Sequence, residues 1–378
     1  MGTDRQRLTT SHVKVGLPLP GDTFDEDGHL LLSAGFVISS DSQLETLLAR
    51  GIYVDIATFQ AHFSNSGSAS PPEARKHDPF LLEESLKKRL NRALRSIGAD
   101  PGAVLQIKEI AAAIQELTAR DPEGAIAGCL LDNDESYSIR HSLFTAILCD
   151  LTGTVLGWPA EKRTSAVCAA LSMNAAMLDL QNKLVTQTEA LNPKQQDVLR
   201  GHPEIAADML REAGVDDPLW LQSVQEHHEL FGGTGYPGAL KQPGEVGQLV
   251  RVADVFGALV SPRGDRKALT PPQALRALIA QEGPRPCATF AGALTKALGV
   301  FPPGTFVKLA NGEIAVVHRQ GAVPNAPFVA SLVCGTGNRY MKPVRRDTQR
   351  QEFAIAGLVP RGQQATGYDL GVLWVRTL

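Results

Sequence analysis

The chain has 378 residues, of which 43% are hydrophobic and 20% charged, and its formal net charge is −3. This composition predicts a globular protein of two or three domains, without the overall basic field that would recruit DNA or RNA. The five cysteines form no CxxC pair, which argues against a disulfide framework or zinc knuckle and favours a reducing, cytoplasmic location. No apolar run reaches the length of a membrane span.

Residues 1–61 are predicted to form a small α/β domain. Asp27-Gly28 lies between apolar stretches and indicates a hairpin turn. The run DSQLETLLARGI, residues 41–52, predicts a short helix that follows it. Residues 62–80 are rich in serine, proline and polar side chains, so they are expected to be a flexible linker.

Residues 81–300 have hydrophobic side chains at helical spacing. Short connections containing proline or glycine separate the predicted helices, which cover residues 81–97, 103–119, 138–156, 162–180, 193–213, 217–230, 247–260, 271–281 and 288–298. Strands do not alternate with these helices. The region is therefore predicted to be a helical bundle and not a βαβ array.

Residues 301–378 are predicted to form a small β domain. The run GTFVKLANGEIAVVHR alternates apolar and polar residues around Asn311-Gly312, which is a strong hairpin signal. The runs APFVASLVCG and GVLWVRTL are expected to be further strands. The predicted fold is thus mainly α, with a helical bundle flanked by a small N-terminal α/β unit and a small C-terminal β domain.

Four histidines in the predicted bundle are candidate metal ligands: His141, His202, His227 and His228. Neutral imidazole binds zinc, iron, manganese or nickel, and separate helices can direct such side chains at one interior point. A single helical histidine is more often a hydrogen-bonded core or surface residue. The adjacent pair, however, precedes the glycine-rich run FGGTGYPG, which indicates that its helix ends there, so both rings can flank one site.

The run HHELFGGTGYP, residues 227–237, resembles the HHExxDGxGYP signature of the HD-GYP domain, a bacterial branch of the HD metallohydrolases. Three further segments follow the order of that family: RHSLFTAILCDLTGTVLGWP, GHPEIAADML and RVADVFGALVSPRGDRKALTPPQAL. The resemblance covers roughly residues 130–300 and implies an HD-type helical fold. It implies the metal ligands His141, His202, His227, His228 and Asp254.

The same resemblance implies two further sets of functional residues. Arg263 and Arg266 occupy positions that contact phosphate in the family, although Asp265 between them would weaken anion binding or pair with one of them. A surface loop implicated in contacts with diguanylate-cyclase domains of the GGDEF type is implied at Gly233, Gly235, Tyr236 and Pro237.

The His-Asp pair that names the family is replaced here. In place of a run such as AALLHDIGK the chain has AALSMNAAM, residues 169–177. Met173 and Asn174 stand at the histidine and aspartate positions, Met177 at the lysine, and Gly232 at the aspartate of the later signature. In HD hydrolases the aspartate bridges two cations that share the attacking water, and a neutral amide cannot replace that anionic bridge. No catalytic residues are therefore expected.

Three imidazoles can hold a zinc-like ion by themselves. The expected cofactor is one divalent transition-metal ion (zinc, iron, manganese or nickel) or none, in which case the histidines are hydrogen-bonded interior groups. The sequence is interpreted as a bacterial signalling protein whose degenerate, catalytically inactive HD-GYP domain binds a protein partner or cyclic di-GMP. One alternative is an active metal-dependent cyclic di-GMP phosphodiesterase with an altered metal site. Another is a scaffold with neither metal nor nucleotide. A homodimer is compatible with each interpretation.

Overall fold

The computed structural model describes residues 5–8, 12–13, 15–16, 18–19, 21–38, 40–59, 78–132, 136–264, 266–282, 287–360, 368 and 370–374. The chain divides into two compact units, Met1–His77 with Arg376–Leu378, and Asp78–Val375. Most of the expected linker, and Asp265, lie outside the described residues. No helix within the described ranges has the length and hydropathy needed to cross a membrane.

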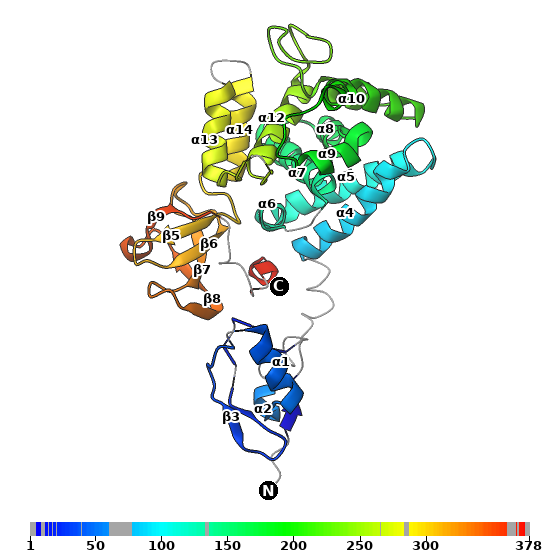
Figure 1. Cartoon of the computed structure of the whole chain (residues 1–378). Helices are drawn as coiled ribbons and strands as arrows, with labels where there is room; N and C mark the ends of the chain where they lie inside the picture. The colour runs from blue at the N-terminus through cyan, green and yellow to red at the C-terminus, as the bar shows by residue number, and fades with distance from the viewer. Residues whose placement is uncertain are drawn as a thin grey trace. The chain divides into compact units, whose positions relative to one another are not determined.

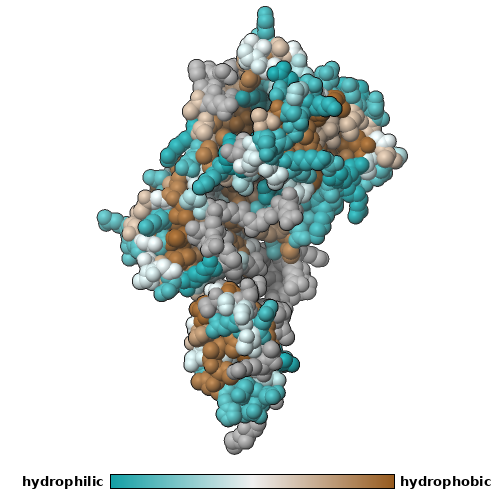
Figure 2. Space-filling model, viewed as in Figure 1, coloured by the Kyte–Doolittle hydropathy of each residue, from teal (hydrophilic) through white to brown (hydrophobic). Residues whose placement is uncertain are grey.

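The described part of the N-terminal unit is a small sheet with the helices α1 and α2. Its strands are β1 (Arg5–Arg7), β2 (Thr23–Phe24), β3 (Leu30–Leu32) and β4 (Tyr53–Asp55), in the order β1-β4-β2-β3, with α1 (Asp41–Arg50) and α2 (Ile56–Phe59). The predicted hairpin at Asp27-Gly28 joins the antiparallel strands β2 and β3. Figure 2 shows a group of apolar side chains on the visible face of this unit. Leu30, Phe36 and Val37 are the exposed large hydrophobic residues among its described residues.

The second unit begins with the helical bundle (Figure 1). Its helices are α4 (Pro79–Arg95), α5 (Ala103–Arg120), α6 (Pro122–Leu131), α7 (Tyr137–Val155), α8 (Ala160–Ser172), α9 (Leu178–Leu184), α10 (Pro193–Glu212), α11 (Pro218–Glu226), α12 (Glu245–Leu259), α13 (Pro271–Glu282) and α14 (Cys287–Leu298). Buried along nearly its whole length, α7 packs against α5, α8, α12 and α14. It is therefore the central helix of the bundle.

Two segments of the bundle differ from the prediction. The helix expected over 162–180 is broken, because α8 ends at Ser172 and a 3-10 turn, η2 (Ala175–Met177), precedes α9. Helix α6 was not predicted, because its sequence PEGAIAGCLL is apolar or small on almost every face and has no helical period. Asp121 caps α6 by accepting a hydrogen bond from the backbone of Gly124.

The C-terminal part is a five-stranded antiparallel sheet in the order β8-β7-β6-β5-β9. Its strands are β5 (Phe306–Leu309), β6 (Ile314–Arg319), β7 (Phe328–Val333), β8 (Arg339–Asp347) and β9 (Ile355–Leu358). The predicted hairpin at Asn311-Gly312 joins β5 and β6, and Gly312 has the positive φ, 86°, that this turn requires.

The expected strand in GVLWVRTL is wrong for the part that is described. Residues Leu370–Leu373 form a 3-10 turn, η5. Leu370, Leu373 and Trp374 are all buried, a spacing that suits a helical turn and not the alternation of a strand. Trp374 joins a core that includes Ala127 and Leu131 of α6, so the sheet and the bundle share apolar side chains.

Candidate functional site

Three histidine side chains converge inside the bundle. His202 lies in α10, His227 is the residue that ends α11, and His228 follows it. One ring nitrogen from each lies within 4.8 Å of those of the other two. The ring centroids of His227 and His228 are 4.2 Å apart, and each is 5.1 Å from that of His202. The end of α11 thus allows two neighbouring rings to face one point.

The backbone orients His202 and His227. Pro203 has no N–H, so it cannot make the helical bond to the carbonyl of Leu199, and Nδ1 of His202 donates to that oxygen at 2.7 Å instead. The carbonyl of Val224 lies in the last turn of α11, where helix carbonyls lack a helical donor, and Nδ1 of His227 donates to it at 2.6 Å.

These bonds settle the tautomers. A carbonyl oxygen only accepts, so both Nδ1 atoms carry the proton, and both Nε2 atoms keep a lone pair when the rings are neutral. The two Nε2 atoms of His202 and His227 face each other at 3.1 Å. Two lone pairs at this distance repel unless a proton or a cation lies between them.

Burial disfavours the proton. Burial, followed by the neighbouring His227, lowers the pKa of His202 to about 3. Burial also lowers the pKa of His227, and lowers that of His228 well below its ordinary value. A tetrahedral zinc ion with bonds of about 2.0–2.1 Å holds its ligand nitrogens ~3.3 Å apart. The three neutral imidazoles therefore fit a divalent transition-metal ion.

His141 of α7 and Asp254 of α12 form an adjoining pair. Nε2 of His141 is 2.6 Å from Oδ1 of Asp254. Burial by itself raises the pKa of Asp254, but the hydrogen bond and charge of His141, with His228 and His227, outweigh it and hold the pKa below its ordinary value. The structure thus places the five predicted ligands in one region, as a cluster of three histidines beside a hydrogen-bonded histidine–carboxylate pair.

The substituted segment contributes neutral side chains. Met173 is fully buried in the main apolar core, and Met177 is also buried. Asn174 is buried, and within the described part of the chain its Oδ1 has no hydrogen-bond partner. Asn174 immediately precedes η2, which packs against α10, the helix of His202. This segment therefore carries a neutral amide oxygen and two thioethers, and no anion, at the three positions where the resemblance implies a histidine, an aspartate and a lysine.

One buried carboxylate holds the Gly-Tyr-Pro loop, a role the sequence analysis missed. Glu229 is 1% exposed, and its carboxylate accepts hydrogen bonds from the backbone of Gly238 and Leu240 at 2.5 and 2.9 Å. The ring of Tyr236 stacks on His228 with centroids 4.7 Å apart. The loop and the histidine cluster are therefore directly in contact.

Gly232 and Gly235 of this loop differ in what a larger side chain would meet. A Cβ on Gly235 would lie 2.3 Å from the backbone nitrogen of Leu230, so only glycine fits there. Gly232, which replaces the aspartate of the signature, has a φ of 89° and open space around it. Its replacement of aspartate thus removes a carboxylate without creating a packing defect.

Arg263 and Arg266 lie after α12 and bond to each other through their backbones. The guanidinium of Arg266 donates to the carbonyl of Ala258 at 2.7 Å, which fixes this segment to the end of α12. Arg263 is exposed. It opposes the rise that burial causes in the pKa of Tyr137, whose ring stacks on His141. Of these two arginines, Arg263 has the exposed side chain and lies close to Tyr137, which packs against His141.

Comparison with known proteins identifies the domain. Residues 125–285 match the family model described as HD domain. The chain is 27% identical over 266 residues to the cyclic di-GMP phosphodiesterase PA4108 of Pseudomonas aeruginosa, covering 67% of this chain and 63% of that protein. It is 30% identical over 140 residues to the cyclic di-GMP phosphodiesterase response regulator RpfG of Xanthomonas campestris pv. campestris, covering 35% and 36% of the two chains.

A solved structure of Bd1817, an HDG"Y"P protein from Bdellovibrio bacteriovorus, aligns with a TM-score of 0.49 and 15% identity, covering 78% of this chain and 99% of that one. The chain spans 63% of the length of the first curated relative and 36% of the second. The match of 125–285 overlaps most of the region, roughly 130–300, that the sequence motifs delimit. Residues 125–285 therefore match the HD domain family model, and the chain is similar to two cyclic di-GMP phosphodiesterases.

Proposed function

We propose that this protein is a regulatory component of cyclic di-GMP signalling whose HD domain binds and does not hydrolyse. The observation that carries the proposal is the pair Met173-Asn174, which places a buried thioether and a neutral amide where the family pattern has a histidine and an aspartate. Two close cations need an anionic bridge between them, because even two unit charges of the same sign at ~4 Å repel by about 4 kcal/mol at an effective dielectric constant of 20.

The proposed metal content is one divalent ion or none. His202, His227 and His228 would hold a single zinc, iron, manganese or nickel ion through nitrogen lone pairs. Such an ion, when bound, polarises water. The residues of this chain orient the lone pairs, through the carbonyls of Leu199 and Val224, and exclude solvent from His202 and His227. In this proposal His141 and Asp254 stay hydrogen-bonded to each other and complete no second ion site.

The proposed binding surface is the Gly-Tyr-Pro loop, with a GGDEF-type diguanylate-cyclase domain as partner. Support comes from its rigidity: Glu229 bonds two backbone amides, and Gly235 lies close against Leu230. A preformed loop loses little conformational entropy on binding. Cyclic di-GMP is a second proposed ligand, held through Arg263 more than Arg266, because the latter already bonds to Ala258. We also propose that the protein is cytoplasmic and forms a homodimer.

The test is a hydrolysis assay with cyclic di-GMP and linear pGpG at micromolar enzyme with Mn²⁺, Fe²⁺ and Ni²⁺, beside binding titrations of cyclic di-GMP and of an isolated GGDEF-type domain. We expect binding of at least one of these without turnover. Metal-dependent turnover that His228→Ala abolishes would contradict the proposal. It would establish instead the alternative, an active phosphodiesterase with an altered site.

The alternative has its own structural support, since Asp254 lies near the histidine cluster and Oδ1 of Asn174 has no hydrogen-bond partner among the described residues. Metal content after purification separates the two functions. One ion per chain or fewer agrees with a binding protein, and two or more would favour the enzyme. No metal together with no binding in either titration would leave only the scaffold interpretation.

A further inference from the structure

One side of α10 is directed away from the bundle. This helix packs against α11 and the turn η2, and it lies at the periphery of the bundle (Figure 1). Ala206 and Leu210 are on its buried side. Six residues on the opposite side are spaced alternately by four and three positions, which is the spacing of a coiled-coil seam. We call them the α10 stripe: Lys194, Val198, Gly201, Ile205, Asp208 and Glu212.

The centre of the α10 stripe is apolar. Val198 and Ile205 are 39% and 50% exposed, and they lie about one helical turn on either side of Gly201. Single exposed apolar residues are common on protein surfaces. Here, however, two of them share the face of one helix, and a partner that covers this face would remove both from water.

Gly201 leaves space in the middle of this face. A Cβ at this position would lie 3.6 Å from Cδ1 of Ile205, and no atom of another described element would lie within 4 Å of it. Glycine inside a helix lowers stability relative to alanine. Elsewhere in the bundle a helical glycine makes room for a neighbour, since a Cβ on Gly257 would lie 3.3 Å from His141. Gly201 makes the same kind of room towards solvent, where a second helix can approach closely.

The two ends of the α10 stripe carry opposite charges. Lys194 lies in the first turn of α10, and Asp208 and Glu212 lie in its last two turns. All three side chains are exposed. Asp208 forms an ion pair with Arg211 of the same helix, but both side chains are more than half exposed, so this pair contributes little and leaves the carboxylate accessible to a second cation. The stripe is therefore complementary to an antiparallel copy of itself, whereas a parallel copy would bring like charges together.

A single two-fold axis matches both the charged and the apolar pairs. Position 201 is midway between Lys194 and Asp208, and the midpoint of Val198 and Ile205 falls between positions 201 and 202. An axis near Gly201 therefore brings Val198 to Ile205 of the second copy and Lys194 to its Asp208 at the same time. The two copies of Gly201 then lie where the helices are closest.

We infer that α10 pairs with α10 of a second copy of this chain, in antiparallel orientation, through the α10 stripe. The inference rests on the homodimer proposed above and names its contact surface. His202 is fully buried, so the contact joins the two helices that carry this residue without using its side chain. Beside the stripe, Arg200 lies between Asp197 and Glu204 at helical spacing, so the acidic side chains of this flank have a basic neighbour. A contact between two helices is small, so we expect a dissociation constant on the order of micromolar.

The first test is sedimentation velocity of the full chain over a series of micromolar concentrations. Gly201→Gln places a long side chain where the helices are closest, so the dimer should be weakened at least about tenfold. Gly292→Gln is the matched control, because Gly292 of α14 also has open space around it and that helix has no exposed large hydrophobic side chain among its described residues. The control should dimerise like the unmodified chain, and circular dichroism should show both variants folded.

The second test reverses the charges. Lys194→Glu should weaken the dimer about tenfold, because two ion pairs per dimer become repulsive contacts. Adding Asp208→Lys and Glu212→Lys should restore the affinity, and Lys308→Glu, at an exposed lysine of β5, should leave it unchanged. A dimer that neither Gly201→Gln nor Lys194→Glu weakens would overturn the α10 stripe as the contact and leave the proposed homodimer standing. A chain that stays monomeric at every concentration would overturn both, while the hydrolysis and binding assays test the regulatory function separately.

Discussion

Acidification should destabilise the helical bundle through His202. Its pKa is about 3 in the folded protein, against an ordinary value of 6.5, with burial as the main cause. Below pH 6.5 the unfolded chain therefore binds a proton that the folded chain does not. The neutral ring contributes stability that is present above pH 6.5 and is lost as the pH falls towards 3.

The magnitude follows from the shift. Each unit of pH within that window costs about 1.4 kcal/mol per proton, so a change from pH 7 to pH 5 should cost roughly 2 kcal/mol from His202 alone. Burial shifts the pKa of His227 and His228 in the same direction, so both should add to the loss. For a domain of ordinary stability, about 5–15 kcal/mol, this is a large fraction.

The assay is urea unfolding followed by far-UV circular dichroism at pH 7 and pH 5, with metal removed by chelation. The matched variant is His202→Asn, whose amide can donate to the carbonyl of Leu199 as Nδ1 does but which cannot be protonated. It should lose about 2 kcal/mol less than the unmodified chain between the two pH values. Equal losses in the two proteins would refute the assignment of a buried neutral imidazole at position 202.

Three further predictions concern the site. Pro203→Ala restores an N–H that competes with His202 for the carbonyl of Leu199. The affinity for Zn²⁺, measured by calorimetry, should therefore fall about tenfold without loss of helix stability. An unchanged affinity would contradict the role of this carbonyl in orienting the ring of His202. Gly235→Ala should lower stability in urea by about 1–3 kcal/mol more than Gly232→Ala, since only the former Cβ meets backbone; similar costs would count against the loop geometry. A triple variant should supply the anionic bridge, so metal analysis should find more ions per chain in it: Met173→His, Asn174→Asp and Met177→Lys. No increase would argue against Asn174 as the reason for a single ion.

Periodicity in the sequence was sufficient for most of the bundle and for both hairpins. The predicted helices at 103–119 and 193–213 begin at the same residues as α5 and α10 and differ from them by one residue at the C-terminal end. Helix α6 and the turn at Leu370–Leu373 were missed because these two segments are buried against each other and against the sheet. A segment buried on every face carries no periodic signal of its own.

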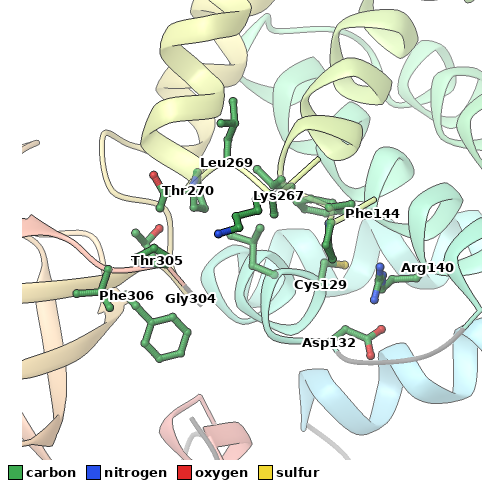
Figure 3. A pocket seen from close by; sticks show the side chains of 18 of the residues that line it. Cys129, Asp132, Arg140, Phe144, Lys267, Leu269, Thr270, Gly304, Thr305 and Phe306 are labelled. Carbon is green, nitrogen blue, oxygen red and sulfur yellow. The ribbon is translucent and has the colours of Figure 1, made fainter. Parts of the chain in front are cut away.

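For the site, the sequence by itself determined which residue types were available. Its motifs predicted by resemblance that the histidines and Asp254 come together, and Met173-Asn174 led to the prediction that the anionic bridge is absent. Only the tertiary structure decided what those residues do. The tautomers of His202 and His227 depend on carbonyls that Pro203 and a helix end leave free, and His141 is paired with Asp254 from another helix. A cavity lined by Phe144 and Phe306 takes its walls from both the bundle and the sheet (Figure 3). Hydrogen-bond direction and burial depend on distances between segments far apart in the chain, which no local pattern records.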